Sequence, residues 1–238
     1  MLILAADTST RLGSLAILRD EEVLAQMADS SDEPYSSRLH SNVESLLKSL
    51  NLSLNRLDLL AVAAGPGSFT GLRVGLTAVK AWAEILDRPI APVSVLEAVA
   101  EQVRVRSAGA FETLFAAVLD ARRGQVFGGL YRQGSEDRRL ELVGQEVVCG
   151  ASEFLEHVRE HATESRLVFA CPTPDIISAA VSDSPFRGSR VEEVSPVLAP
   201  VIGLLGYHQA LRSQVVDALR LDANYVRRTD AELKLKVE

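Results

Sequence analysis

The segment Gly65-Pro66-Gly67-Ser68-Phe69-Thr70-Gly71-Leu72-Arg73-Val74-Gly75-Leu76 decides how this chain is expected to fold. It follows the apolar run 59–64 and leads into an apolar helical pattern at 72–86. A strand, a glycine-rich turn and a helix in this order can hold a phosphate on the free N–H groups of the helix N-terminus. However, the lysine of a Walker A loop and the three-glycine spacing of a Rossmann turn are both missing. The pattern favours the alternative, a tight turn whose glycines let two backbone segments pack closely.

The composition is that of an ordinary globular protein. The chain has 238 residues, of which 47% are hydrophobic and 24% charged, enough for one large or two small cores. Its formal net charge of −7 argues against broad, sequence-independent binding to nucleic acid, which needs an exposed positive field. Cys149 and Cys171 lack a paired spacing and are expected to be buried thiols of a reducing compartment. No signal peptide and no run of membrane-spanning length is recognised, so we expect a cytoplasmic protein without a membrane contact.

The first half alternates short apolar strands with amphipathic helices. Hydrophobic periodicity predicts strands at 2–6, 14–18, 23–27, 58–64 and 90–93, and helices at 37–50, 72–86 and 94–105. The run 58–64 is almost continuously apolar, as expected for a strand that is covered on both faces. Ser94 followed by Glu97 is a capping box, which places the N-terminus of the third helix.

The second half repeats this order of elements after a plausible linker at 107–110. Strands are predicted at 114–119, 126–131, 140–148 and 167–170, and helices at 151–161, 175–182 and 197–212. Because both halves begin with three strands, we expect two related α/β lobes, the second one smaller. The predicted domains are an N-terminal, partner-binding lobe, 1–106, and a C-terminal lobe, 107–238, whose last helix could pack back on the first lobe.

Polar side chains that could bind a ligand or catalyse a reaction are few. Asp7-Thr8-Ser9 follows the first strand and could contact a phosphate or the water shell of a magnesium ion, but an Asx or ST turn that closes a hairpin is favoured. No serine stands in a G-x-S-x-G elbow, and neither cysteine has the sequence context of a nucleophile. We therefore predict no catalytic residue.

Two histidines have a spacing that can bind a metal. His157 and His161 are four residues apart on one predicted helix, a spacing that can hold zinc. The zinc-protease pattern requires a glutamate directly after the first histidine, where this chain has Val158. Because Arg159 and Glu160 are charged neighbours, a solvated helix face is favoured. We expect no bound metal and no other cofactor.

Several segments together resemble the TsaB (YeaZ) family. They are Asp7-Thr8-Ser9, the loop 65–76, Pro89-Ile90-Ala91-Pro92-Val93-Ser94-Val95-Leu96-Glu97-Ala98, Leu119-Asp120-Ala121-Arg122-Arg123-Gly124-Gln125-Val126-Phe127 and Tyr225-Val226-Arg227-Arg228. The match covers nearly the whole chain. The resemblance implies a two-lobed α/β fold of the actin-like ATPase (ASKHA, RNase H-like) class.

The resemblance also implies a function and a set of partners. It implies a part in making threonylcarbamoyladenosine in tRNA, next to the anticodon, a step that bacteria carry out with a complex of TsaD, TsaB and the ATPase TsaE. The expected role is that of a non-catalytic scaffold subunit that binds and supports a TsaD-type transferase. A TsaE-type ATPase is a further expected partner, the chain is expected to form a homodimer when alone, and tRNA is reached indirectly through the complex.

Comparison with the paralogous transferase indicates why catalysis is not expected. The TsaD motifs look like A-S-R-x-H, G-P-G and V-N-H-M-E-G-H. Residues 36–40 resemble the first and residues 65–67 the second, but the third corresponds to 93–99, where Val95 and Val99 replace both metal-binding histidines. Valine has no lone pair for a metal, and Glu97 alone cannot make a site because a catalytic ion takes several protein ligands.

One departure from the family pattern concerns the nucleotide. Many members carry a short glycine-rich turn, roughly G-D-G-A, after the strand predicted at 167–170, whereas this chain has Ala170-Cys171-Pro172-Thr173-Pro174. Proline lacks an N–H group and has a fixed φ, so the turn is a poor phosphate cradle. This counts against one alternative function, an ATP-binding or small-molecule kinase-like member of the fold. The valines at 95 and 99 count against the other, a glycoprotease-like hydrolase.

The partner surface is expected on helices 37–50 and 72–86. The second is apolar nearly all round and therefore needs cover on every side, and Gly71 and Gly75 would allow close helix contact. Both helices could build a helical bundle across a two-fold axis, although some of their side chains must cover their own sheet. The predicted partner-binding residues are Leu39, His40, Val43, Leu46, Leu50, Gly71, Gly75, Val79 and Trp82.

Overall fold

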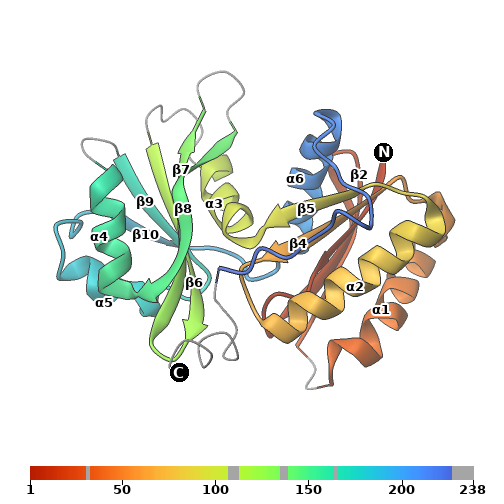
Figure 1. The fold of residues 1–238 in the computed structure, drawn as a ribbon, viewed down its shortest axis with the longest axis horizontal. Coiled ribbons are helices and arrows are strands. Elements are labelled where there is room, and N and C mark those ends of the chain that lie inside the picture. The colour runs from red at the N-terminus through yellow and green to blue at the C-terminus, as the bar shows by residue number, and fades with distance from the viewer. Residues whose placement is uncertain (31–32, 107–112, 135–138, 163–165, 227–238) are drawn as a thin grey trace, which may run out of the picture. The chain divides into compact units, whose positions relative to one another are not determined.

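The computed structural model describes the chain except for residues 31–32, 107–112, 135–138, 163–165 and 227–238 (Figure 1). Two compact units are present. The first combines Met1–Ala98 with Ser195–Asn224, and the second is built mainly from Val99–Val194. The predicted linker at 107–110 lies outside the described residues. No helix in the described ranges has both the length and the apolar character needed to cross a membrane.

The first unit is built on a five-stranded mixed sheet. Its strands lie in the order β3-β2-β1-β4-β5, with β2 antiparallel to β1 and β3, and with β4 parallel to both β1 and β5. The elements are β1 (Leu2–Asp7), β2 (Gly13–Arg19), β3 (Glu22–Asp29), α1 (Tyr35–Ser49), a short 3-10 turn (Leu54–Arg56), β4 (Leu59–Gly65), α2 (Phe69–Leu86), β5 (Ile90–Ser94), the start of α3 (Val95–Arg106) and α6 (Ala199–Leu211).

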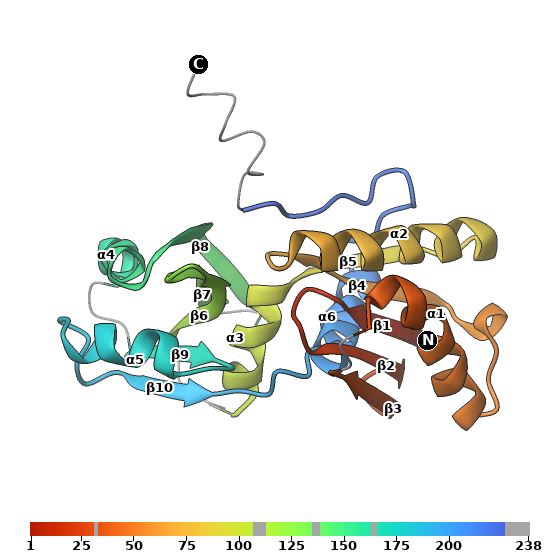
Figure 2. The same ribbon diagram turned by 90° about the horizontal axis from the view of Figure 1, so that it is seen from below.

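Helices cover both faces of this sheet. Figures 1 and 2 show α1 and α2 side by side on one face and α6 on the other. The α1 and α2 face is packed with large aliphatic side chains of β1, β2 and β4, such as Leu4, Ile17 and Leu60. On the α6 face, Gly206 of α6 packs against Ala61 and Ala91, and a Cβ on Gly206 would lie 2.7 Å from that of Ala61. Small residues on both elements therefore let α6 approach the sheet closely.

The segment after α6 continues along the first unit. Val216 and Ile90 exchange two backbone hydrogen bonds, each 2.8 Å long, and the N–H of Asn224 donates to the carbonyl of Ala64 at 2.7 Å. Leu221, between them, is buried in the core of α1 and α2. Residues from the C-terminal third of the chain thus complete the unit that begins at Met1.

The second unit has a sheet of the same design. Its order is β10-β9-β6-β7-β8, with β7 antiparallel to β6 and β8, and with β9 parallel to β6 and β10. Read from the central strand β6, this repeats the first sheet strand for strand. The elements are the remainder of α3, β6 (Thr113–Arg122), β7 (Gln125–Gln133), β8 (Leu140–Gly150), α4 (Ala151–His161), β9 (Arg166–Cys171), α5 (Asp175–Ser182) and β10 (Arg190–Glu193).

The helices α4 and α5 bury their apolar sides in the core of this unit. Phe154, Leu155 and Val158 of α4 pack with β6, β7 and β9. A Cβ on Gly128 of β7 would collide with the ring of Phe154, so a glycine there makes room for the aromatic side chain. Figure 1 shows α4 lying along β8.

The predicted elements are confirmed, with differences at their ends. The Ser94 hydroxyl accepts a hydrogen bond from the N–H of Glu97 at 3.2 Å, as the capping box requires. Helix α2 begins at Phe69, three residues before the predicted start, because the Ser68 hydroxyl caps it by accepting from the N–H of Gly71 at 3.3 Å. The short strand β10 was not predicted, because its polar sequence lacks a clear alternation.

Candidate functional site

The polar turn after β1 closes on itself. One carboxylate oxygen of Asp7, Oδ1, accepts hydrogen bonds from the N–H of Ser9 at 2.8 Å and from its hydroxyl at 2.6 Å. A side chain that binds the backbone two residues ahead is an Asx turn. The prediction of such a turn is confirmed, and these two hydrogen bonds occupy Oδ1 of Asp7 and the N–H and hydroxyl of Ser9.

The glycine-rich turn before α2 packs directly against this Asx turn. The N–H of Ser68 donates to the carbonyl of Ser9 at 2.7 Å, and the Thr8 hydroxyl donates to the carbonyl of Gly71 at 2.8 Å. A Cβ on Gly67 would lie 2.5 Å from the Ser9 carbonyl oxygen, and one on Gly71 or Gly75 would collide with Thr8. The favoured alternative, close packing of two backbone segments, is therefore confirmed.

Two N–H groups that a phosphate could use already have acceptors within the protein. The N–H of Ser68 is bound to Ser9 and that of Gly71 to the Ser68 hydroxyl. A helix N-terminus binds an anion through its free N–H groups, and the protein's own oxygens accept from these two. Its geometry supports a structural role in joining α2 to β1.

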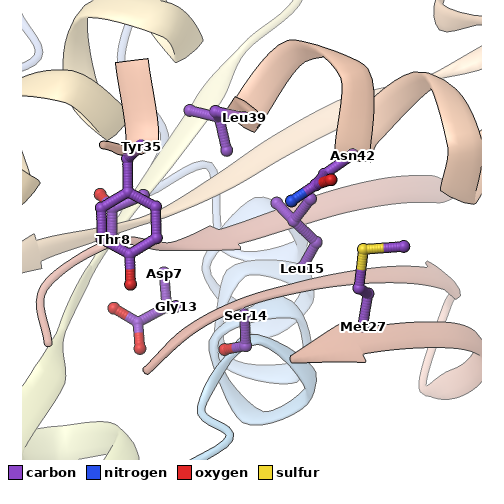
Figure 3. A pocket seen from close by; sticks show the side chains of 9 residues that line it. All are labelled: Asp7, Thr8, Gly13, Ser14, Leu15, Met27, Tyr35, Leu39 and Asn42. Carbon is purple, nitrogen blue, oxygen red and sulfur yellow. The ribbon is translucent and has the colours of Figure 1, made fainter. Parts of the chain in front are cut away.

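A small cavity lies beside the Asx turn, under the start of α1 (Figure 3). Tyr35, the first residue of α1, covers it and donates from its hydroxyl toward the carbonyls of Thr10 and Arg11, both at 2.9 Å. The cavity volume is about 10 Å³. This is close to what one water molecule needs and far below the size of a nucleotide pocket. The lining residues are Asp7, Thr8, Gly13, Ser14, Leu15, Met27, Tyr35, Leu39 and Asn42.

Asp7 is the buried ionisable group of this cavity. Its side chain is 1% exposed, and Oδ2 has no hydrogen-bond partner among the described residues. Burial raises the pKa of this carboxyl from 3.8 to about 6, although hydrogen bonds from the side chain and backbone of Ser9 act in the opposite direction. Without a counter-charge, the ionised form is the costly one.

This raised pKa gives a pH dependence with a defined sign. Below pH 3.8 the carboxyl is protonated in both folded and unfolded chains, and between pH 3.8 and about 6 the folded chain holds its proton more tightly. Stability from this group is therefore complete in acid and is lost as the pH rises through about 6. We expect the unfolding free energy of the wild type, minus that of Asp7→Asn, to fall by about 2 kcal/mol between pH 4 and pH 7.

Urea unfolding of both proteins at several pH values measures this difference, in which the titration of all other groups cancels. Asparagine keeps the acceptor for Ser9 but cannot ionise. A difference that does not change with pH would show that Asp7 titrates as an ordinary carboxyl.

Most of the predicted partner-binding residues lie inside the first unit. Leu50 is half-buried against the same core, and His40 is exposed, with its ring centroid 6.3 Å from that of Trp82. The remaining seven are buried in this chain: Leu39, Val43, Leu46, Gly71, Gly75, Val79 and Trp82. Gly71 and Gly75 pack against Thr8, which leaves no room for a Cβ at either position. Contact with a partner stays a prediction for the helices, and their exposed residues are the ones free to make it.

The exposed side of α2 carries an apolar stripe that the sequence interpretation did not single out. Val74 and Ala78 are half-buried, and Ala81 and Ile85 are exposed, Ile85 to 80%. Their spacing of four, three and four residues places them on one face of the helix. The sequence carried a signal for this stripe, because helix 72–86 is apolar nearly all round. Such a helix has more apolar residues than one sheet can cover.

The charged residues around the histidine pair of α4 are exposed, as predicted, but the histidines themselves are only partly solvated. The His157 side chain is 20% exposed and its Nε2 is buried, while His161 is half-buried. The reason is tertiary: β8 runs along α4 and passes over both rings at Gly144.

Comparison with known proteins places the chain in a family. A family model described as "TsaD: tRNA N6-adenosine threonylcarbamoyltransferase" matches residues 22–197. The "tRNA threonylcarbamoyladenosine biosynthesis protein TsaB" of Bacillus subtilis is 38% identical over 160 residues, which are 67% of this chain and 67% of that protein. The chain belongs to the TsaB (YeaZ) family. The structure of YeaZ from Pseudomonas aeruginosa agrees, with a TM-score of 0.74 and 27% identity over 94% of this chain and 99% of that one.

More distant structures show the fold class of this TsaB-family chain. Component A of the (R)-2-hydroxyglutaryl-CoA dehydratase of Acidaminococcus fermentans has a TM-score of 0.54 at 9% identity, over 89% of this chain and 99% of that one. The two-lobed ASKHA fold is thereby confirmed. A shared fold at this identity says nothing about shared activity.

The two valines that the sequence resemblance sets against the transferase's histidines are buried in this TsaB-family chain. Val95 and Val99 are both 0% exposed, one turn apart on α3. They pack in the interior, where an aliphatic side chain adds hydrophobic stabilisation. The helix that would present two imidazoles instead presents a packed surface.

The turn after β9 also differs from a phosphate cradle. The N–H of Thr173 donates to the Cys171 sulfur at 3.3 Å, and the Cys171 thiol donates to the Thr173 carbonyl at 3.1 Å. Burial, with a smaller contribution from the charge of Asp120, raises the pKa of Cys171 to about 11, against the effect of the Thr173 backbone. The pKa of Cys149 is also raised to about 11, by burial and by Glu153. Both thiols are therefore protonated and poor nucleophiles at neutral pH.

Proposed function

We propose that this protein is a non-catalytic subunit that binds and supports a TsaD-type transferase in the N6-threonylcarbamoylation of adenosine in tRNA, beside the anticodon. The observation that carries the proposal is the pair Val95 and Val99, which stand buried where the related transferase has metal-binding histidines. The TsaB relatives, named as biosynthesis proteins of threonylcarbamoyladenosine, support the pathway. We further propose a cytoplasmic location, a TsaE-type ATPase as a second partner and contact with tRNA through the complex.

A subunit of this kind needs a surface for its partner, and the exposed sides of α1 and α2 fit that need. The two helices lie side by side, and their outward residues include His40, Ala81 and Ile85. An isoleucine that is 80% exposed gains about 25 cal/mol for each Å² of apolar surface that a partner covers. The same surface would pair two copies across a two-fold axis when the transferase is absent.

Two other functions of the same fold fit less well. An ATP-binding or kinase-like protein needs free N–H groups at its phosphate loops, whereas those of Ser68, Gly71 and Thr173 have acceptors within the protein. A glycoprotease-like hydrolase needs a metal or an activated nucleophile. The valines at 95 and 99 offer no ligand, and the raised pKa values of both cysteines disfavour a thiolate.

Reconstitution with a TsaD-type subunit from the same organism tests the proposal. We expect the two proteins to co-purify, and we expect transfer of the threonylcarbamoyl group to tRNA to be about tenfold faster or more when this chain is added, within the usual range of coupling between bound sites. The isolated chain should transfer nothing. Equal rates with and without the chain, or turnover by the chain alone, would contradict a supporting, non-catalytic role.

A further inference from the structure

Two histidines of α4 direct a ring nitrogen toward the same place in the second unit. His157 and His161 follow each other by one helical turn, with ring centroids 5.1 Å apart. A Cβ built on Gly144 of β8 would lie 3.4 Å from Nε2 of His161 and 3.6 Å from Nε2 of His157. Both Nε2 atoms therefore converge on the point where β8 crosses the helix.

This point is left open by the backbone of β8. Gly144 has a φ of +77°, a conformation that side-chain-bearing residues rarely adopt, so the strand passes the histidines without a side chain between them. Among the described residues, apart from the glycine and its chain neighbours, nothing lies closer than 3.4 Å to that Cβ position. The absence of a side chain at Gly144 keeps the space between this strand and the two Nε2 atoms free of a Cβ.

The hydrogen bonding of the histidines leaves lone pairs for this place. Nδ1 of His161 lies 3.0 Å from the carbonyl of His157 and can only donate to it, which leaves Nε2 of the neutral ring as an acceptor. A metal-binding histidine commonly has its other nitrogen fixed in this way. Nε2 of His157 is buried and has no hydrogen-bond partner in the described part of the chain.

A carboxylate completes the cluster. Glu160 lies on the same turn of α4, with an oxygen 3.9 Å from Nδ1 of His157. One ligand atom from each of the three residues lies within 4.8 Å of the others. Two imidazoles and one carboxylate favour zinc over magnesium or calcium, which prefer oxygen ligands alone.

We propose that His157, His161 and Glu160 form a zinc site between α4 and β8, with water as the fourth ligand. Rotation of the three side chains, above all of the exposed Glu160, whose carboxylate lies on the Nδ1 side of His157, would bring the ligand atoms to the distances of about 2.0–2.2 Å that zinc requires. The proposal replaces the expectation of a metal-free chain and does not depend on the proposed function. Because all three protein ligands lie on one helix, the ion would stabilise α4 against fraying at its C-terminal end.

Titration of the full chain with Zn²⁺ tests the proposal. After chelator treatment, calorimetry should show one zinc ion bound per chain. His157→Ala and His161→Ala should each weaken binding about tenfold or more, since even the loss of a group that only orients a ligand has this effect. His208→Ala is the control, because His208 also lies beside a glutamate, with Nε2 3.0 Å from Glu21, and should bind zinc as the wild type does.

Two further measurements keep the test independent of folding defects. Co²⁺ added to the wild type should give the visible absorption of a four-coordinate site. Glu160→Gln should alter that spectrum. This variant should still fold, because the Glu160 side chain is 71% exposed in the wild type. Zinc should also raise the melting temperature of the wild type in proportion to its occupancy. The proposal fails if the wild type binds no more zinc than the double variant His157→Ala, His161→Ala. It also fails if zinc leaves the melting temperature of the wild type unchanged.

Discussion

We expect Val43→Glu to abolish folding of the first unit. Val43 is 0% exposed, in the core that α1 and α2 share with the sheet. A carboxylate there has neither water nor a counter-charge, and burying it unpaired, together with the overpacking of a longer side chain, costs more than about 4 kcal/mol. Since a whole domain is stable by only about 5–15 kcal/mol, soluble yield and the helical circular dichroism signal should collapse.

A matched charge on the same helix is the control. Ser45 lies two residues further along α1 and is exposed, so Ser45→Glu should unfold in urea as the wild type does. Val79→Glu, at a second core position that is 1% exposed, should behave like Val43→Glu. If Val43→Glu is folded and as stable as the wild type, the side chain is not in the core, and it becomes available again as a partner contact.

The largest effect on assembly is expected at Ile85. We predict that Ile85→Glu keeps the fold, because the side chain is 80% exposed on α2, but weakens binding of the TsaD-type subunit and self-association by about 30-fold or more. A central apolar contact of an interface commonly contributes about 2 kcal/mol or more. Light scattering measures the mass of the chain alone, and calorimetry with the transferase subunit measures its affinity.

Leu211→Glu is the control for this experiment. Leu211 is another exposed leucine-sized residue, 62% exposed, but it ends α6, which covers the opposite face of the same sheet. The Leu211→Glu variant should bind the TsaD-type subunit as the wild type does. A wild-type mass and affinity for Ile85→Glu would move the partner surface away from α2, and equal losses in both variants would point to a general effect of added negative charge.

Local signals were sufficient to predict the secondary structure. The continuous apolar run of β4 and the capping box at Ser94 depend on neighbours within a few residues, and both are confirmed. The echo between the halves is also confirmed, since both sheets have the same strand order around their first strand. The glycine-rich loop was correctly favoured as a packing turn, because it lacks the lysine that a phosphate loop needs.

Interactions between distant segments could not be read in this way. The apolar stripe of α1 has the same appearance whether it faces its own sheet or a partner, so the burial of Val43 and Trp82 was not decided by the sequence. The exposure of Ile85 depends equally on which side of α2 the sheet covers. The placement of His157 and His161 depends on Gly144, thirteen residues before the first of them, whose conformation no helical pattern reveals.

The path of the chain through the first unit has a consequence for synthesis on the ribosome. The sheet is made from residues 1–98, but α6, the helix that covers one of its faces, begins only at Ala199, and the segment that pairs with Ile90 follows at Val216. At 5–20 residues per second, the interval between residue 98 and the end of α6 at Leu211 lasts roughly 6 to 23 s. During that time the nascent sheet has no helix of its own for one apolar face, while the whole of Val99–Val194 is being made.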